Sequence, residues 1–212
     1  MYVAIYDLDK TLVRRATFTP FLAFAAGKIA PWRMLLLPVW VMMMIGYKLG
    51  FYDRTSLKTA GMKLMLGKVS VERLEEVGEA FAVHHLENAG WMAGVVAMVE
   101  QDRAKGAELV VATAAFEFYA RAFASRLGIE TVIATKWDGA SIPDGNCYGD
   151  AKRKRVTDWL GNRAREAEIR FVSDSFADEP LLAISQDPIF VTASEKKRAR
   201  AEGLGWKVIS GD

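Results

Sequence analysis

Two aspartates, one residue apart, follow a short apolar run near the start of this 212-residue chain. Residues 3–6 read Val-Ala-Ile-Tyr, which is typical of a buried β-strand, and Asp7, Leu8 and Asp9 come next. Along an extended backbone Asp7 and Asp9 point the same way, while Leu8 turns into the fold. In an open α/β sheet, ligands bind at this end of the strands. Two carboxylates so close require a cation or a shared proton, and both suit phosphoryl transfer with magnesium.

The rest of the chain divides into a helical segment and a segment in which strands and helices alternate. Residues 14–90 read as helical, with no convincing strand. Further strands are predicted at 109–113, 131–134, 169–173, 189–191 and 207–209. Helices are predicted at 91–105, 116–127, 150–162, 178–185 and 195–202, and a loop or short hairpin at 136–149.

This order predicts an α/β fold, a doubly wound parallel sheet covered by helices on both faces. The helical block then forms an all-helical cap inserted after the first strand. We expect a catalytic core of residues 1–13 and 91–212 and a cap of residues 14–90.

Two sites further along the chain carry groups suited to binding phosphate. Thr113 ends the second predicted strand, and the N–H of Ala114 follows it at the start of a helical turn. The alternative for Thr113 is an ordinary helix cap. Lys152 belongs to a basic run that would usually be a solvated helix face, and only its spacing from Gly149 marks it as a phosphate clamp.

A second acidic pair follows the predicted strand 169–173. Asp174 lies at the end of this strand and Asp178 on the first helical turn beyond it, so both can point back at a shared cation. The alternative is a pair of acids that stabilise a helix N-terminus. Two acids four residues apart after a buried strand are nevertheless the more specific signal.

In this order, the motifs resemble those of the haloacid dehalogenase (HAD) superfamily of phosphatases. They are Asp-x-Asp-x-Thr at 7–11, Thr113, Gly-x-x-Lys at 149–152 and Asp-x-x-x-Asp at 174–178. The match spans nearly the whole chain. The helical insertion after the first motif resembles the cap of the phosphoserine-phosphatase-like branch, subfamily IB.

The resemblance implies a role for each of these positions. Asp7 would be the nucleophile and Asp9 the acid/base, while Lys152 would hold both nucleophile and phosphate. Thr113 and Ala114 would bind the phosphate. The carboxylates of Asp7 and Asp174, with the backbone carbonyl of Asp9, would hold Mg²⁺, and Thr11 and Asp178 would support the site.

One departure bears on the substrate. In phosphoserine phosphatases the ninth residue after the nucleophile is a glutamate that pairs with the amino group of the substrate, but here it is Ala16. The neighbouring Arg14 and Arg15 would repel an ammonium group. Phosphoserine is therefore not the expected substrate.

The predicted cap is basic and apolar. Nine basic residues and one acid, Asp53, lie between Arg14 and Lys68. Residues 34–47 carry no charge, but as a helix they would reach only about 21 Å, and a bilayer needs about 20 apolar residues. Pro38 also interrupts this run, so we expect no transmembrane helix.

Two interpretations of residues 20–51 stay open. Their apolar side chains pack within the cap, on the core or in a homodimer, or they contact an anionic membrane surface with Trp32 and Trp40 as interfacial anchors. The apolar segment and the sequence 173–182 also show a weaker resemblance to phosphatidylglycerophosphate phosphatase C, which implies a lipid phosphate.

We therefore expect a Mg²⁺-dependent phosphomonoester hydrolase that acts through an aspartyl-phosphate, with a lipid or amphiphilic phosphate as substrate. The alternatives are a soluble small-metabolite phosphatase and a non-catalytic phosphate-binding regulatory protein. The single Cys147 and a strand that begins directly after Met1 predict a cytoplasmic protein without a secretory signal, either free or peripheral on the inner face of the cytoplasmic membrane. The basic run at 195–200 lacks interleaved aromatics, so no nucleic-acid partner is expected.

Overall fold

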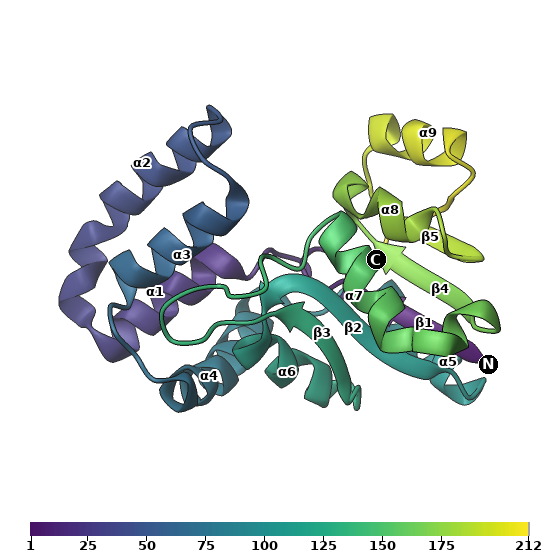
Figure 1. Ribbon diagram of the computed structural model, residues 1–212, viewed down its shortest axis with the longest axis horizontal. Coiled ribbons are helices and arrows are strands. Elements are labelled where there is room, and N and C mark those ends of the chain that lie inside the picture. Colours follow the sequence, from purple (N-terminus) through teal and green to yellow (C-terminus); the bar gives the residue numbers. More distant parts are fainter. Residues whose placement is uncertain (212) are drawn as a thin grey trace.

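The computed structural model describes residues 1–211, and within them the strands form one parallel sheet (Figure 1). The strand order is β3-β2-β1-β4-β5-β6. Their bounds are β1 Tyr2–Tyr6, β2 Glu108–Phe116, β3 Thr131–Thr135, β4 Glu168–Ser173, β5 Asp187–Val191 and β6 Lys207–Ile209. The direction of winding reverses beside β1, so its carboxyl end lies at the switch point where such sheets bind ligands. The predicted α/β class is confirmed.

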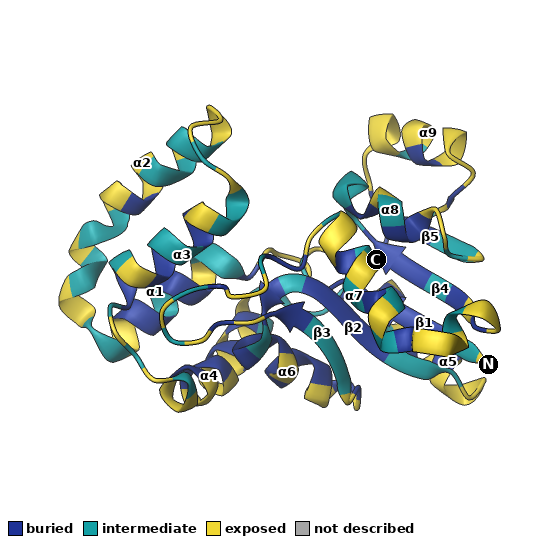
Figure 2. Ribbon diagram, in the orientation of Figure 1, coloured by how far each residue is buried: buried dark blue, intermediate teal, exposed yellow. Residues whose placement is uncertain are grey.

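Alternate residues of the central strand serve two apolar cores. Val3 and Ile5 pack on one face of the sheet, and Ala4 and Tyr6 pack on the other. The first face is covered by α7 Asp150–Leu160, α8 Glu179–Leu182 and α9 Glu195–Gly203, and the second by α5 Ala93–Ala104 and α6 Glu117–Arg126. The central strands are therefore largely buried on both sides, as the mostly dark blue β1, β2 and β4 of Figure 2 show, whereas β6 at the edge of the sheet is partly exposed.

The inserted segment is helical. It comprises α1 Phe18–Ile29, a 3₁₀ helix η1 Pro31–Leu36, α2 Leu37–Lys48, α3 Arg54–Met65 and α4 Val71–Ala89. Helix α4 packs on α6, and a Cβ at Gly78 would lie 2.7 Å from the Phe118 carbonyl oxygen, so this close approach requires glycine. The segment shares one apolar cluster with the second face of the sheet. The exact division into core and cap stays a prediction.

Two predicted boundaries are wrong. Strand β2 continues to Phe116, so Thr113 and Ala114 lie inside the strand and not at a helical turn, and α6 begins only at Glu117. The β2–β3 register shifts between Ala112 and Phe116, and pairing resumes where Phe116 lies opposite Thr135. The helix predicted at 178–185 is replaced by a 3₁₀ turn, Phe176–Asp178, followed by the short α8.

The two tryptophans predicted as anchors differ. Trp32 is 62% exposed, whereas Trp40 is buried, with its ring edge-on to Phe18 at 5.7 Å. Trp40 is therefore part of the cap interior, because α2 turns it towards α1 and α3. Along residues 1–211, no helix has both the length and the apolar character needed to cross a bilayer.

Candidate active site

A polar cavity of about 190 Å³ opens at the carboxyl end of β1. The structure brings to it every predicted site residue except Thr11, which lies just behind: Asp7, Asp9, Thr113, Ala114, Lys152, Asp174 and Asp178. They come from β2, from the segments that follow β1 and β4, and from the first turn of α7. The cap contributes Ala16 and Arg54. The predicted grouping of four separate motifs is thus present in the structure, while the chemical role of each residue stays a prediction.

Lys152 lies at the base of this cavity, almost wholly buried. Its Nζ donates to Asp7 Oδ1 at 2.8 Å and to Asp178 Oδ2 at 2.7 Å. Gly149, with φ of 57°, precedes the first residue of α7 and adopts a backbone conformation that favours glycine. Burial on its own lowers the pKa of Lys152, but the charges of Asp178 and Asp7 outweigh burial and raise it above its ordinary value.

The polar cavity is lined by more carboxylate groups than basic side chains. Burial raises the pKa of Asp7 to about 7, and Asp178 reinforces this effect against the lowering by Lys152. Burial also raises the pKa of Asp174 to about 6. Among the residues described, Asp178 Oδ1 is buried without a hydrogen-bond partner. A cavity of this kind favours a bound cation, because the cation would neutralise the excess charge.

The donor set fits magnesium. Over residues 1–211, no three histidine, cysteine or acidic side chains form a ready-made metal cluster. Magnesium, however, is commonly bound by one or two carboxylates together with water and substrate oxygens. The predicted ligands are the carboxylates of Asp7 and Asp174 and the carbonyl of Asp9. Because only two of them are side chains, this set needs no cluster of three acidic residues and matches the usual coordination of magnesium.

Asp9 is held by one of its two carboxylate oxygens. Oδ1 accepts the backbone N–H of Thr17 at 2.9 Å and the Thr17 hydroxyl at 2.7 Å. Leu8, between the two aspartates, is fully buried, so the predicted alternation is confirmed. The anchored Oδ1 fixes the orientation of Asp9 at the rim of the cavity.

The remaining predicted residues order the phosphate-facing backbone. Thr113 Oγ1 accepts the N–H of Ala115 at 3.1 Å, so its own hydroxyl hydrogen must point elsewhere. Thr11 Oγ1 accepts the N–H of Asp174 at 3.0 Å and joins the two acidic loops. These contacts support the site from behind and use no group that a ligand would need.

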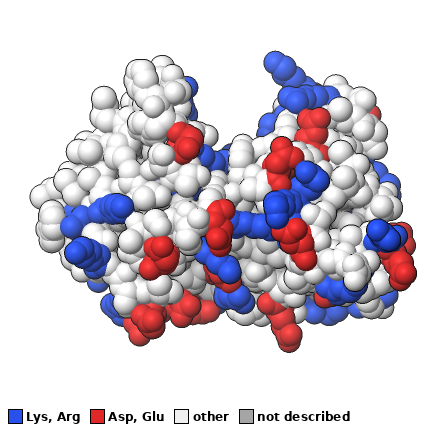
Figure 3. Space-filling model, viewed as in Figure 1, with Lys and Arg blue, Asp and Glu red and all other residues white. Residues whose placement is uncertain are grey.

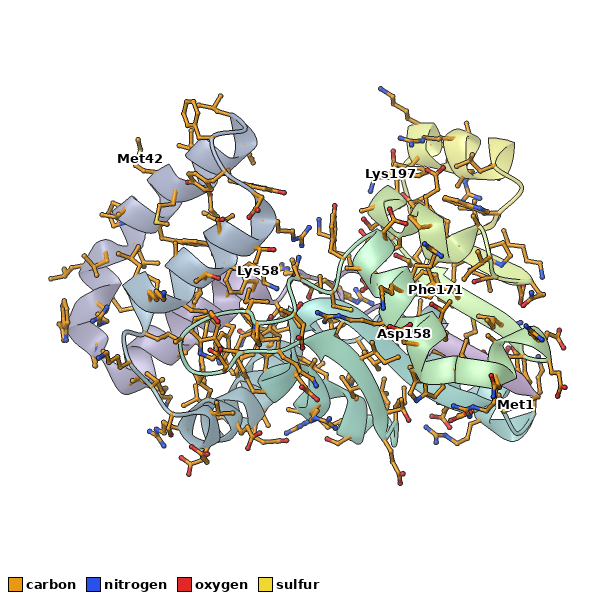
Figure 4. The ribbon with its side chains drawn as sticks, viewed as in Figure 1. Met1, Met42, Lys58, Asp158, Phe171 and Lys197 are labelled. Atoms are coloured by element: carbon orange, nitrogen blue, oxygen red, sulfur yellow. The ribbon has the colours of Figure 1, made fainter. Side chains whose placement is uncertain are left out.

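Two supporting residues were not predicted. The Oγ of Ser173 donates to Asp178 Oδ2 at 2.6 Å and so helps to fix that carboxylate. Lys58 of α3 is buried and donates to the carbonyl of Ala114 and to Asn146 Oδ1 (Figure 4). Only the basic excess of the cap hinted at such a residue.

Burial lowers the pKa of Lys58 to about 7, with a contribution from the nearby charge of Arg54. The faces of two aromatic rings lie near its ammonium group, at 4.4 Å for Phe116 and 5.4 Å for Phe18. Arg54 itself stacks on Tyr148 at 4.5 Å, and both line the polar cavity. The cap therefore places two basic groups next to the phosphate-facing strand.

The chain is similar to several known proteins. The chain is 28% identical to protein CicA of Caulobacter vibrioides over 192 residues, which cover 86% of this chain and 82% of CicA. A Bordetella pertussis protein of unknown function has a similar structure, with a TM-score of 0.84, 24% identity and coverage of 100% and 99% of the two chains. A phospho-aspartyl intermediate analogue of phosphoserine phosphatase has a TM-score of 0.61 at 14% identity, with coverage of 97% and 91%.

The two structural similarities establish a shared fold. The family assignment comes from the sequence, because residues 4–183 match the family described as haloacid dehalogenase-like hydrolases. The predictions of this superfamily, of an enzyme and of a fold like that of phosphoserine phosphatase are confirmed. This chain belongs to the haloacid dehalogenase-like hydrolases.

Proposed function

We propose that the protein is a Mg²⁺-dependent phosphomonoester hydrolase that works through an aspartyl-phosphate. This proposal depends on two buried ion pairs of Lys152. Its Nζ lies 2.8 Å from Asp7 Oδ1 and 2.7 Å from Asp178 Oδ2. An ammonium group beside a nucleophilic carboxylate can bind the phosphoryl group that this carboxylate attacks. The structural neighbour solved as a phospho-aspartyl analogue gives independent support.

The residues divide the reaction between them. Asp7 attacks phosphorus and forms the aspartyl-phosphate, while Asp9 donates a proton to the departing alcohol. Lys152, the Thr113 hydroxyl and the Ala114 N–H bind the phosphoryl oxygens. Asp9 then takes a proton from the water that hydrolyses the aspartyl-phosphate. Bound Mg²⁺, held by Asp7, Asp9 and Asp174, would supply charge neutralisation for the phosphoryl oxygens.

Hydrolysis of p-nitrophenyl phosphate tests this proposal. We expect release of p-nitrophenol with Mg²⁺, loss of activity in EDTA and recovery when Mg²⁺ is restored. No hydrolysis, together with tight binding of inorganic phosphate, would instead indicate the regulatory alternative. Activity that is unaffected by EDTA would contradict the metal part of the proposal.

We also propose that the substrate is an amphiphilic phosphate met at an anionic membrane surface, the inner face of the cytoplasmic membrane. Large apolar side chains are exposed along η1, α2 and the loop after it, and we call them the outer apolar face: Trp32, Leu35, Val39, Val41, Met42, Ile45, Leu49 and Phe51. Leu35 is 82% exposed and Phe51 is 76% exposed. The upper left of Figure 3, where α2 lies, is accordingly largely free of charged side chains, and blue side chains lie below it.

The charges near this face support the same partner. Residues 20–51 contain Lys28, Arg33 and Lys48 but no acid. Each base near an anionic bilayer contributes about 1 kcal/mol to binding. A group of large exposed apolar side chains on one element commonly marks an interaction site.

Co-sedimentation with liposomes tests the membrane proposal. Vesicles that contain anionic lipid should bind the protein, and neutral vesicles should bind it less. Leu35→Ser with Phe51→Ser should weaken binding, whereas Val83→Ser, on an exposed position of α4, should not. Absence of binding would favour a soluble small-metabolite phosphatase, and a dimer in sedimentation velocity that these two serines dissociate would assign the face to a homodimer.

A further inference from the structure

A second cavity, of about 300 Å³, adjoins the polar cavity on the side of the cap. The two cavities are both lined by Asp9, Ala16, Arg54 and Ala114. An alcohol esterified to a phosphate beside Asp7, and pointing past Asp9, would therefore enter this second space. Its volume is at the lower end of the range for small-molecule pockets.

The walls of this cap cavity are largely hydrocarbon and aromatic. Helices α1, α2 and α3 contribute Phe18, Pro20, Trp40, Met44, Tyr47 and Leu57. In the described part of the chain, the only acid that lines it is Asp9 at the entrance. The Lys58 ammonium is already engaged with the Ala114 carbonyl and Asn146.

These walls discriminate between leaving groups. A polar alcohol would lose hydration against a mostly apolar wall, which is costly, whereas a hydrocarbon chain is favoured by leaving water. A substrate ammonium would meet the positive charge of Arg54, which lines both cavities. Ala16 stands where the cavities meet, and its methyl group leaves the passage open and adds no charge.

We propose that the cap cavity binds the hydrocarbon part of the leaving group, so that the substrate is a phosphate monoester of an alcohol whose alkyl chain begins close to the ester oxygen. This inference rests on the proposed phosphatase function and specifies its substrate class. It also separates two apolar regions of the cap, because the cavity takes a chain of the substrate and the outer apolar face contacts the bilayer.

A series of n-alkyl phosphates tests this assignment without any membrane. Ethyl, butyl, hexyl and octyl phosphate are compared as monomers, with Mg²⁺, by their kcat/KM. Each methylene that enters an apolar site contributes a factor of about four. We expect kcat/KM to rise by about this factor per methylene and then to level off when the cavity is full.

A matched pair of variants tests where the alkyl chain of the substrate binds. Met44 lines the cavity, whereas Met42, two residues away on α2, is 66% exposed and points outwards (Figure 4). Met44→Trp should fill the cavity and bring the octyl-to-ethyl ratio of kcat/KM close to one. Met42→Trp should keep the wild-type ratio. Circular dichroism and the thermal midpoint establish that both variants are folded.

The outcomes are distinct. If the wild-type enzyme hydrolyses ethyl phosphate and the series is flat, the cavity assignment is wrong and the phosphatase proposal stands, whatever the variants do. If Met42→Trp removes the rise and Met44→Trp does not, the chain binds outside the cavity and the inference is again wrong. If the enzyme hydrolyses neither the n-alkyl phosphates nor p-nitrophenyl phosphate, both proposals are overturned.

Discussion

The two ends of the parallel sheet both bury charged side chains, but they differ in how well those charges are satisfied. At the amino end, Asp102 is fully buried, and its two oxygens accept the hydroxyls of Tyr2 at 3.0 Å and Tyr6 at 2.5 Å. Asp102 also pairs with Arg170 at 2.6 Å, and Arg170 pairs in turn with Asp187. Every oxygen of Asp102 has a donor.

At the carboxyl end, Asp7 and Asp178 share the single ammonium group of Lys152. Within residues 1–211, one oxygen of Asp178 is buried without a donor, and Asp174 adds a further acid to the same cavity. The network at the amino end is therefore complete without a ligand, whereas Asp178 at the carboxyl end still lacks one donor among the described residues. The incomplete network at the carboxyl end is unfavourable for the free energy of folding, and a bound cation would offset this effect. Such local destabilisation is common at functional sites.

The largest expected effect comes from a change at the carboxyl end. Asp7→Asn removes the proposed nucleophile, and we expect kcat for p-nitrophenyl phosphate to fall by at least about 10⁴-fold. The thermal midpoint should not fall, because the substitution removes a carboxylate whose burial is unfavourable and leaves Lys152 paired with Asp178. Wild-type activity in this variant would refute the assignment of the nucleophile.

The matched change at the amino end should lower stability and leave activity unchanged. Asp102→Asn weakens the ion pair to Arg170, and we expect the free energy of unfolding to fall by about 3 kcal/mol. Urea denaturation measures this loss. Since Asp102 does not line the polar cavity, kcat measured below the transition should stay at the wild-type value. A large loss of kcat in a folded variant would show that the two ends are coupled.

A third change extends the comparison to Lys58, a buried lysine with neutral hydrogen-bond acceptors. Burial lowers its pKa from 10.5 to about 7. Between these pH values the unfolded chain binds a proton that the folded chain lacks, so this group makes stability rise with pH. The slope is at most about 1.4 kcal/mol per pH unit.

Lys58→Met removes this contribution. The free energy of unfolding of the wild type, measured relative to the variant by urea denaturation, should therefore increase from pH 7 towards pH 10. Lys63→Met, at an exposed position of the same helix, is the control and should show no such trend. A difference between Lys58→Met and wild type that is constant across this range would mean that Lys58 stays charged.

The smallest expected effect concerns the helix that carries Lys58 and Arg54. Asp53 caps α3, and its Oδ1 accepts the N–H of Ser56 at 2.6 Å. Asp53→Ala should lower the free energy of unfolding by about 1 kcal/mol, and Asp53→Asn, which can still cap, should lower it much less. Equal losses in the two variants would show that the charge of Asp53, and not its hydrogen bond, stabilises the helix.

Much of the site could be predicted because it depends on local pattern. Each motif follows an apolar strand or opens a helix, and parallel strands bring their carboxyl ends to one edge. The proximity of Asp7, Lys152 and Asp174 could therefore be predicted from the local pattern alone. The contribution of Ser173 could not be predicted, because it depends on the direction of a side chain across a turn. Lys58 could not be predicted either, because its partners lie 56 and 88 residues away.

The apolar segment of the cap shows the same limit. Its composition predicted helices and an interaction with something apolar, but it could not tell inward from outward side chains. Helix α2 is apolar around its whole circumference, so its sequence pattern assigns no face. Packing against α1 and α3 turned Trp40 inwards and left Met42 exposed.

By itself, the sequence determined the α/β class, the parallel sheet, the helical insertion and the set of acids and lysine that meet at one edge. These follow from the periodicity of apolar residues and from strand direction, which are properties of local chain segments. The tertiary structure alone decided the longer β2, the burial of Lys58 and the cavity behind Asp9. All three arise where distant segments pack together, and the energy of such contacts depends on neighbours that no single stretch of sequence contains.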